Sequence, residues 1–294
     1  MSVRPDADAA ATAATLAEAL PYIRRFLGAV IVVKFGGSTL AAGDLDSASV
    51  LAEFAQDVVL MRSVGMLPVV VHGGGPQIGA LMEALGKTPE FRDGQRVTDA
   101  ETLDIARMVL VGKVNREIVG ALNLHAPIAV GLSGEDGGFI TAVERDPALG
   151  FVGDVESVDP VLLRHLLAEG LVPVVATIAP DATGQAYNVN ADAVAGAIAE
   201  SLGARRLIFL TDVPGVRARA EDPSSVLSTT SAVALEALVD SGGIVGGMIP
   251  KARACARAVR DGVEAAHILD GRIEHALLLE LFTESGVGTM VVGS

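Results

Sequence analysis

Hydrophobic positions along the chain fall into short continuous runs that alternate with longer stretches of helical spacing. The short runs predict buried strands at residues 30–33, 67–71, 127–131, 172–178, 206–211, 266–268 and 289–292. Helical spacing predicts helices at residues 50–64, 78–85, 100–124, 161–169, 192–202, 233–241, 250–261 and 273–282. The irregular, glycine- and aspartate-rich residues 133–153 are expected to form a hairpin. Elements that alternate in this way predict an α/β sandwich with a largely parallel sheet.

Residues 1–28 precede this alternation and form a unit of their own. Four aliphatic residues recur there at helical spacing: Leu16, Leu20, Ile23 and Leu27. Pro21 lies inside the pattern, so it should begin a second helix or kink a continuous one. The apolar stripe of this helix must be buried, either on its own domain or on another subunit. A second series of strands and helices restarts near Gly203, which divides the remainder into residues 29–203 and 204–294.

Composition narrows the class of protein. Half of the residues are hydrophobic (50%) but only 3% are aromatic, so the core is aliphatic, as in parallel sheets covered by helices. The 22 basic and 36 acidic residues give a net charge of -14, which disfavours nucleic acid or an anionic membrane as a partner. No apolar run approaches the roughly 20 residues that span a bilayer. A single cysteine, Cys255, and an acidic start without a signal peptide favour a cytoplasmic location.

Three glycine turns stand beside charged or polar residues. Lys34 precedes Gly36 and Gly37, residues 73–75 are all glycine and directly follow a predicted strand, and Lys251 follows a pair of glycines. A strand that ends in glycines presents backbone N–H groups that can bind phosphate or carboxylate oxygens. Lysines at the same place can neutralise a phosphoryl group during its transfer. Each motif alone is also typical of a solvated lysine or a tight turn, but together they indicate phosphoryl transfer without a Walker motif.

The order of the motifs resembles a known family. Six segments follow one another along the chain: Lys34-Phe-Gly-Gly, His72-Gly-Gly-Gly-Pro, Gln95-Arg-Val-Thr98, Tyr187-Asn-Val-Asn-Ala-Asp192, Leu210-Thr-Asp-Val-Pro-Gly-Val216 and Gly246-Gly-Met-Ile-Pro-Lys251. From about residue 30 to residue 293 the chain resembles the amino acid kinase superfamily, and within it the branch that phosphorylates N-acetyl-L-glutamate. The resemblance implies a three-layer αβα sandwich of two lobes, with residues 29–203 for acceptor binding and dimerisation and residues 204–294 for ATP.

The implied reaction transfers the γ-phosphate of ATP to the γ-carboxylate of N-acetyl-L-glutamate, giving N-acetyl-L-glutamyl 5-phosphate in arginine biosynthesis. A carboxylate is already ionised at neutral pH, so the catalytic problem is to position two anions rather than to remove a proton. By resemblance, Lys34 and Lys251 stabilise the transferring phosphoryl group and Asp192 holds both ammonium groups. The N–H groups of Gly36 and Gly37 are expected to contact the phosphoryl oxygens.

Four residues are implied in binding the acceptor: Gly74, Gly75, Arg96 and Asn188. Arg96 suits the α-carboxylate because a guanidinium binds a carboxylate through two parallel hydrogen bonds. Simpler readings remain open from the residues alone. Arg96 could pair with Asp93 or Asp99 on the surface, Asn188 could belong to a turn, and Asp192 could cap the following helix.

The C-terminal series is expected to hold the nucleotide. The implied residues lie in two segments: Thr211, Asp212, Val213, Pro214, Gly215 and Val216, then Gly243, Ile244, Val245 and Gly246. ATP is expected to bring Mg²⁺ on its own phosphates, so no dedicated metal site is predicted.

Two features resemble the arginine-inhibited branch of the family: the N-terminal helix and residues 267–289. In that branch the helix joins dimers into a hexamer, a trimer of dimers, and L-arginine binds between the helix and the C-terminal lobe. Residues Tyr22, His267, Glu280 and Gly286 are the candidates, with Glu280 facing the guanidinium. Two alternatives stay open: a kinase for acetylaminoadipate or another amino-acid carboxylate, and an inactive sensor of arginine or nucleotide.

Overall fold

A computed structural model describes residues 7–36, 47–92, 94–219, 221–284 and 286–293. The helices are α1 (Ala7–Phe26), α3 (Ser47–Ser63), α4 (Gly75–Ala84), α5 (Ala100–Arg107), α6 (Asn115–His125), α7 (Val161–Ala168), α8 (Ala191–Leu202), α9 (Ala232–Asp240), α10 (Met248–Arg260) and α11 (Ala276–Phe282). The strands are β1 (Val30–Phe35), β2 (Leu67–His72), β3 (Phe91–Arg92), β4 (Gln95–Arg96), β5 (Ala129–Ser133), β6 (Ile140–Glu144), β7 (Val152–Val158), β8 (Val172–Ala176), β9 (Ile178–Pro180), β10 (Ala186–Val189), β11 (Arg206–Thr211), β12 (Thr229–Ser231), β13 (Ala265–Asp270) and β14 (Gly288–Val292).

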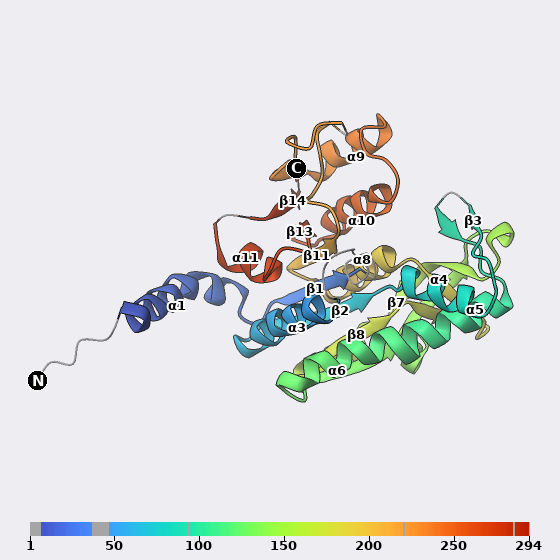
Figure 1. Cartoon of the computed structure of the whole chain (residues 1–294), viewed down its shortest axis with the longest axis horizontal. Coiled ribbons are helices and arrows are strands. Elements are labelled where there is room, and N and C mark those ends of the chain that lie inside the picture. The colour runs from blue at the N-terminus through green and yellow to red at the C-terminus, as the bar shows by residue number, and fades with distance from the viewer. Residues whose placement is uncertain (1–6, 37–46, 93, 220, 285, 294) are drawn as a thin grey trace, which may run out of the picture.

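The centre of the molecule is an eight-stranded sheet in the order β12-β14-β13-β11-β1-β2-β8-β5 (Figure 1). Its neighbours pair in parallel except β13 and β14, which are antiparallel. Because the strands are parallel, the carboxyl ends of β1, β2 and β11 lie at one edge, where Phe35 pairs with His72 and with Leu210. The predicted α/β sandwich with a largely parallel sheet is confirmed.

Each face of the sheet carries its own hydrophobic core. Side chains alternate along a strand, so Ile31 and Val33 of β1 face one core while Val32 faces the other. The first core packs the sheet against α3, α4, α5, α6 and α11. The second packs it against α7, α8, α9 and α10. Both faces of the strands are buried, which explains why they appear in the sequence as continuous apolar runs.

A second sheet of four strands, in the order β6-β7-β10-β9, lies beside the main one. The predicted hairpin corresponds to β6 and β7, which pair antiparallel from Ile140 to Val158. Strands β9 and β10 extend this sheet and were not predicted. The short hairpin β3–β4 was also not predicted, because two-residue strands leave no periodic signal.

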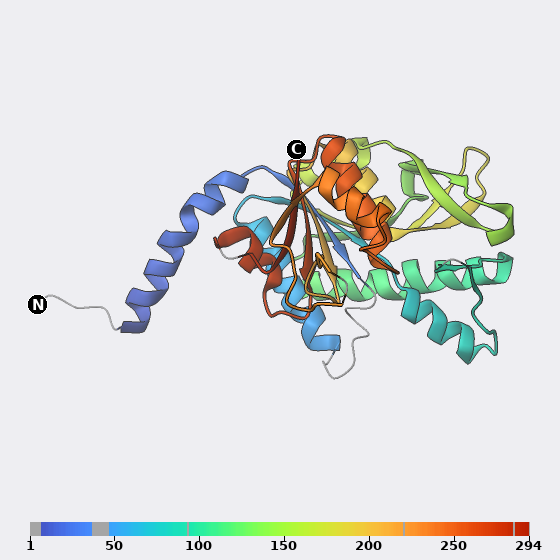
Figure 2. The same ribbon diagram turned by 90° about the horizontal axis from the view of Figure 1, so that it is seen from above.

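Two helices depart from simple expectation. The predicted helix at residues 100–124 is α5 and α6 joined by a π-helical turn, η1 (Met108–Val114). At the N-terminus, α1 is a single helix with Pro21 inside it. Both ribbon views show α1 projecting from the body (Figure 2). Among the described helices, none is both long and apolar enough to cross a membrane. The division at residue 203 stays a prediction, since β1 pairs directly with β11 across it.

Candidate active site

Two lysines meet on one buried carboxylate at the carboxyl edge of the sheet. Lys34 Nζ, from β1, lies 3.0 Å from Asp192 Oδ1, and Lys251 Nζ, from the first turn of α10, lies 3.2 Å from Asp192 Oδ2. The Asp192 side chain is 7% exposed, against 10% for Lys34 and 19% for Lys251. These three residues, which are far apart in the sequence, therefore converge because the end of β1 and the N-terminal turns of α8 and α10 meet at this edge.

The charge state of Asp192 follows from its surroundings. Burial alone would raise its pKa, but the positive charges of Lys34 and Lys251 outweigh burial and lower it. The N-terminus of α8 adds a favourable dipole for an anion. Asp192 is therefore a carboxylate at neutral pH and can hold both ammonium groups.

Asn190, not Asp192, caps α8. The Asn190 Oδ1 accepts hydrogen bonds from Asp192 N at 2.9 Å and Ala193 N at 3.2 Å. The alternative that Asp192 is a helix cap is therefore wrong. The cap frees the Asp192 carboxylate to face the lysines.

The glycine turns line the same edge of the sheet. Gly36 directly follows β1 and is buried, whereas Gly37 lies outside the described residues. Gly74 precedes α4, and a Cβ there would come within 2.8 Å of Leu110 Cδ2 in η1. A Cβ at Gly75 would meet no atom within 4 Å. Glycine is therefore needed at position 74 because η1 approaches its backbone closely, whether or not a ligand is bound.

Arg96 lies against the glycine turn rather than in a surface ion pair with Asp99. Its Nη2 donates to Gly75 O at 2.9 Å, and its guanidinium covers the Phe91 ring at 4.8 Å from the centroid. Asp99 instead accepts from Lys87 Nζ at 2.7 Å and caps α5. A shallow surface pocket opens here, lined by Gly75, Pro76, Gly79, Ala80, Glu83, Pro89, Phe91 and Arg96. The other predicted partner, Asp93, lies outside the described residues.

Asn188 belongs to a strand, so its reading as a turn residue is wrong. Its N–H donates to Phe151 O at 2.9 Å, and it pairs with Val152 of β7 and Ile178 of β9. The side chain is half-buried. Asn188 lies four residues before Asp192, in the strand that leads into α8.

The predicted nucleotide segments lie in the C-terminal half, one at the end of β11 and the other after α9. Thr211 ends β11, and its hydroxyl accepts from Val213 N at 2.9 Å, which closes the turn after the strand. Gly215 has φ 145°, and a Cβ there would lie 2.6 Å from Thr289 Oγ1. Val216 and Ile244 share one core, while Asp212, Pro214, Val245 and Gly246 are exposed. Each segment therefore combines exposed residues with a side chain that is buried in the core.

Three of the four predicted arginine-site residues are in contact. His267 Nδ1 lies 2.7 Å from Glu280 Oε1, and a Cβ at Gly286 would lie 3.0 Å from Glu280 Oε2. Burial would raise the pKa of Glu280, but the hydrogen bond from His267 and its charge lower it. The fourth, Tyr22, lies on α1, which packs against α11. No hydrogen bond within the described part of the chain joins its phenol to the other three.

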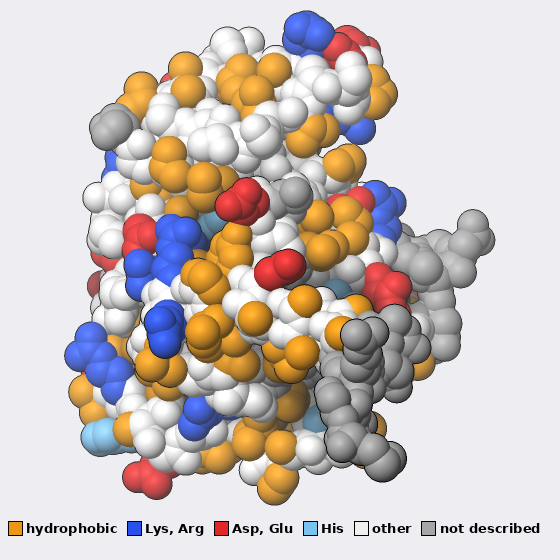
Figure 3. All heavy atoms as spheres, turned by 90° about the vertical axis from the view of Figure 1, so that its left-hand side faces the viewer, with side chains coloured by type: hydrophobic (Ala, Val, Ile, Leu, Met, Phe, Trp, Pro, Cys, Tyr) orange, Lys and Arg blue, Asp and Glu red, His pale blue; other side chains and the backbone are white. Residues whose placement is uncertain are grey.

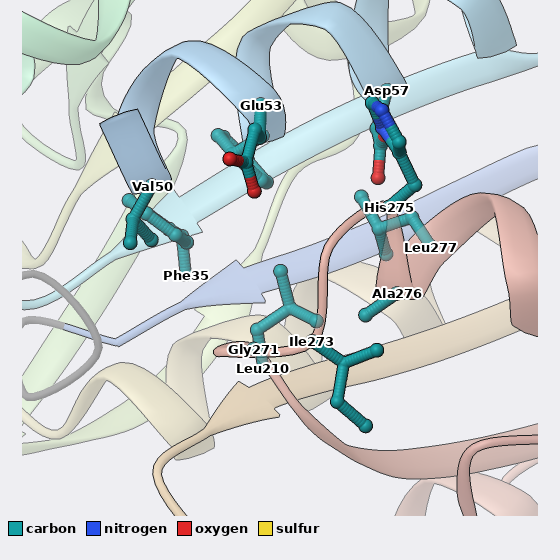
Figure 4. A pocket seen from close by; sticks show the side chains of 11 residues that line it. Phe35, Val50, Glu53, Asp57, Leu210, Gly271, Ile273, His275, Ala276 and Leu277 are labelled. Atoms are coloured by element: carbon teal, nitrogen blue, oxygen red, sulfur yellow. The ribbon is translucent and has the colours of Figure 1, made fainter. Parts of the chain in front are cut away.

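A second pocket was missed by the sequence reasoning. It lies between α3 and the segment before α11, with Glu53, Asp57 and His275 on its wall (Figure 4). His275 Nδ1 is 2.6 Å from Asp57 Oδ1, and burial raises the pKa of Asp57 to about 6. In the sequence Asp57 looks like any acid on an amphipathic helix. Its burial and its contact with His275 left no local signal, because His275 is far away along the chain.

The comparisons with known proteins agree with this architecture. Residues 29–270 match the amino acid kinase family. The chain therefore belongs to that family.

Close relatives define the group within it. Acetylglutamate kinases from Salinispora tropica and Symbiobacterium thermophilum are each 52% identical to the chain, covering 99% and 98% of it and 99% of each relative. Identity of this degree over nearly the whole length places the chain with the acetylglutamate kinases.

Solved structures extend the comparison. N-acetylglutamate synthase from Neisseria gonorrhoeae, in complex with coenzyme A and N-acetyl-glutamate, aligns with TM-score 0.83 and 28% identity over 96% of this chain and 63% of that one. Carbamate kinase from Giardia lamblia aligns with TM-score 0.69 at 17% identity and covers 91% of this chain and 99% of its own, which shows the shared fold.

Proposed function

We propose that the protein transfers the γ-phosphoryl group of MgATP to the γ-carboxylate of N-acetyl-L-glutamate, giving N-acetyl-L-glutamyl 5-phosphate for arginine biosynthesis. The observation that carries the residue-level account is the contact of Lys34 and Lys251 with the single buried carboxylate of Asp192. The acceptor is ionised at neutral pH, so no general base is needed. The site instead has to bring two anions together.

The lysines perform that task. Each ammonium group neutralises negative charge that spreads over the oxygens of the phosphoryl group during transfer. Asp192 keeps both ammonium groups at one point and is a positioning residue. The N–H groups of Gly36 and Gly37, at the end of β1, bind the phosphoryl oxygens.

The acceptor lies across the adjacent strand ends. Its γ-carboxylate faces Lys34, and its α-carboxylate is bound by Arg96, whose guanidinium already lies 2.9 Å from the backbone of Gly75. The N–H groups of Gly74 and Gly75 and the amide of Asn188 supply the remaining donors. Because Phe35 at the end of β1 pairs with His72 at the end of β2, the lysine and the glycine turn are neighbours.

The nucleotide occupies the exposed backbone over β11 and α9. Residues 211–216 and 243–246 bind adenine and ribose, so the γ-phosphate points toward Lys251. Mg²⁺ would enter with ATP as part of the substrate and would offset negative charge on its phosphates.

We further propose feedback inhibition by L-arginine and assembly into a hexamer through α1. The carboxylate of Glu280, held by His267 Nδ1 at 2.7 Å and by Val287 N at 2.9 Å, is the partner proposed for the guanidinium, and a Cβ at Gly286 would lie 3.0 Å from its Oε2. N-acetylglutamate synthase from Neisseria gonorrhoeae, which aligns with TM-score 0.80 and 28% identity, has been solved with coenzyme A and L-arginine.

The assembly through α1 is supported by its exposed apolar side chains. Hydrophobic side chains are frequent on the face from which α1 projects, and Leu16 and Leu27 are 65% and 66% exposed (Figure 3). Pairing of α1 with another subunit would bury them.

An assay that traps acyl phosphate with hydroxylamine tests the proposal. N-acetyl-L-glutamate, L-glutamate, L-aspartate and acetylaminoadipate are compared as acceptors with MgATP, each with and without L-arginine. Turnover of acetylglutamate alone, suppressed by arginine, is expected. Turnover without suppression would refute the arginine site, and preference for acetylaminoadipate would reassign the acceptor. No turnover with any acceptor would favour an inactive sensor.

A further inference from the structure

A buried hydrogen-bond network lies directly beneath the glycine turn. His72, the last residue of β2, and Asn115, the first residue of α6, are both fully buried. The Asn115 Nδ2 lies 3.0 Å from His72 Nε2 and 2.9 Å from Val174 O of β8. On its other side, Asn115 Oδ1 accepts from Arg116 Nη2. His72 Nδ1 lies 3.1 Å from Gly73 O.

These contacts determine the tautomer of His72. Val174 O can only accept and Arg116 can only donate, so the Asn115 amide must turn its NH₂ group toward β8 and His72. The His72 Nε2 then has to accept, and the ring proton has to be on Nδ1, where it donates to Gly73 O. Burial lowers the pKa of His72 to about 4, and the charges of Arg116 and Lys34 act in the same direction. His72 is therefore neutral at pH 7.

The consequence reaches the proposed acceptor site through one peptide plane. In a trans peptide the C=O of Gly73 and the N–H of Gly74 point in opposite directions. With Gly73 O held toward the buried His72 ring, the Gly74 N–H points away from that ring. Within the described residues no hydrogen bond takes up this N–H.

The surrounding residues are shaped to fit this network. The π-helical turn η1 ends at Val114, directly before Asn115, so it helps to position the Asn115 side chain against β2 and β8. The same turn presses Leu110 against Gly74. A Cβ at Gly131 of β5 would overlap both Asn115 and Arg116, so glycine leaves the space that the pair occupies. Single π-helical turns inside α-helices are frequent at functional sites.

We propose that Asn115 and His72 are positioning residues that orient the Gly74 N–H toward the acceptor's carboxylate. Neither touches the substrate. The inference rests on the proposed function for the identity of that acceptor.

Kinetics of two leucine variants test the proposal. Asn115→Leu keeps the side-chain size but removes the donor to His72. The matched control is Asn123→Leu, on the same helix, because Asn123 also bonds to the sheet but away from His72, with Ala129 N of β5 donating to its Oδ1 at 2.8 Å. For Asn115→Leu we expect KM for N-acetyl-L-glutamate to rise at least about tenfold, the effect of roughly one hydrogen bond. KM for ATP should stay within about twofold, and Asn123→Leu should change neither constant.

An unchanged acetylglutamate KM in Asn115→Leu would overturn the proposal. So would an equal rise in both KM values, which indicates a general structural defect. Tautomer-sensitive ¹⁵N NMR of the wild-type histidines provides a test that needs no variant and no substrate. A proton on His72 Nδ1, with no titration between about pH 5 and 8, is expected, and an Nε2 proton would refute the network. If wild-type protein does not phosphorylate acetylglutamate, the proposed function fails while the tautomer still tests the network.

Discussion

Replacing Asp192 by asparagine removes the negative charge that Lys34 and Lys251 share in the candidate active site. The lysine nitrogens lie 3.0 and 3.2 Å from its oxygens. At an effective dielectric constant of about 20, Coulomb's law gives each contact about 5 kcal/mol before the cost of removing the charges from water. Loss of one partner from a buried ion pair costs about 3–5 kcal/mol in practice. The lysines retain 10% and 19% exposure, so the lower value of about 3 kcal/mol is expected for the free energy of unfolding.

The same substitution should reduce kcat by about 10²–10³-fold. This is the usual effect of losing one preorganised group that stabilises charge in the transition state. Denaturant unfolding and the hydroxylamine assay measure the two effects on one preparation. The pKa of Asp192 is lowered in the folded protein, so its stabilisation is present above about pH 4 and is lost as the pH falls through the folded value. The stability difference between wild type and Asp192→Asn should therefore shrink in acid.

Asp261→Asn is the matched control, because Asp261 follows the C-terminus of α10, the helix that carries Lys251. Asp261 pairs with Arg257 at 3.3 Å, but the two side chains are 38% and 71% exposed. An exposed pair contributes less than about 1 kcal/mol, so this variant should keep wild-type kcat. If Asp192→Asn retained kcat within about threefold, or if both variants lost equal activity, the assignment of Asp192 as the shared counterion would be refuted.

Three further outcomes are expected. Arg96→Lys should raise KM for acetylglutamate at least about tenfold and leave KM for ATP unchanged in steady-state kinetics, because lysine cannot form two parallel hydrogen bonds. A KM for acetylglutamate equal to that of wild type would show that Arg96 does not bind the acceptor. Deleting residues 1–28 should convert hexamers to dimers on a sizing column and weaken arginine inhibition, and an unchanged elution volume would contradict the role of α1. The pKa of Asp57 is raised to about 6, so the folded protein should lose stability as the pH rises from about 4 to 6. Asp57→Asn should flatten that part of the thermal unfolding profile, and an unaltered slope would show that Asp57 is not responsible.

The sequence predicted the layers well because both faces of the strands are buried. Runs such as Leu67–His72 are then continuous in the sequence and hard to mistake. Strand pairs that depend on distant partners were missed. Ile178–Pro180 and Ala186–Val189 form strands only because β7 and its neighbours offer them an edge. The π-helical turn at Met108–Val114 also left no signal, because helical periodicity barely changes over one wide turn.

The candidate site was predictable only through the order of its motifs. Nothing in local pattern links Lys34 with Lys251, and the topology of the sheet is what brings both to Asp192. The alternative of Asp192 as the cap of α8 stayed open in the sequence because Asn190 and Asp192 are both good cap formers two positions apart, and the structure assigns the cap to Asn190. His72 and Asn115 were missed as a pair because buried networks depend on which strands are neighbours.

The central claim is that Lys34 and Lys251 together stabilise the transferring phosphoryl group. Its most direct test is the rate of acyl-phosphate formation from MgATP and N-acetyl-L-glutamate in wild type, Lys34→Met and Lys251→Met, at saturating substrates and with folding verified by thermal unfolding. We expect rapid acyl-phosphate formation in wild type and a rate at least about 10²-fold lower in each folded variant. Retention of most of the wild-type rate in either variant would contradict it.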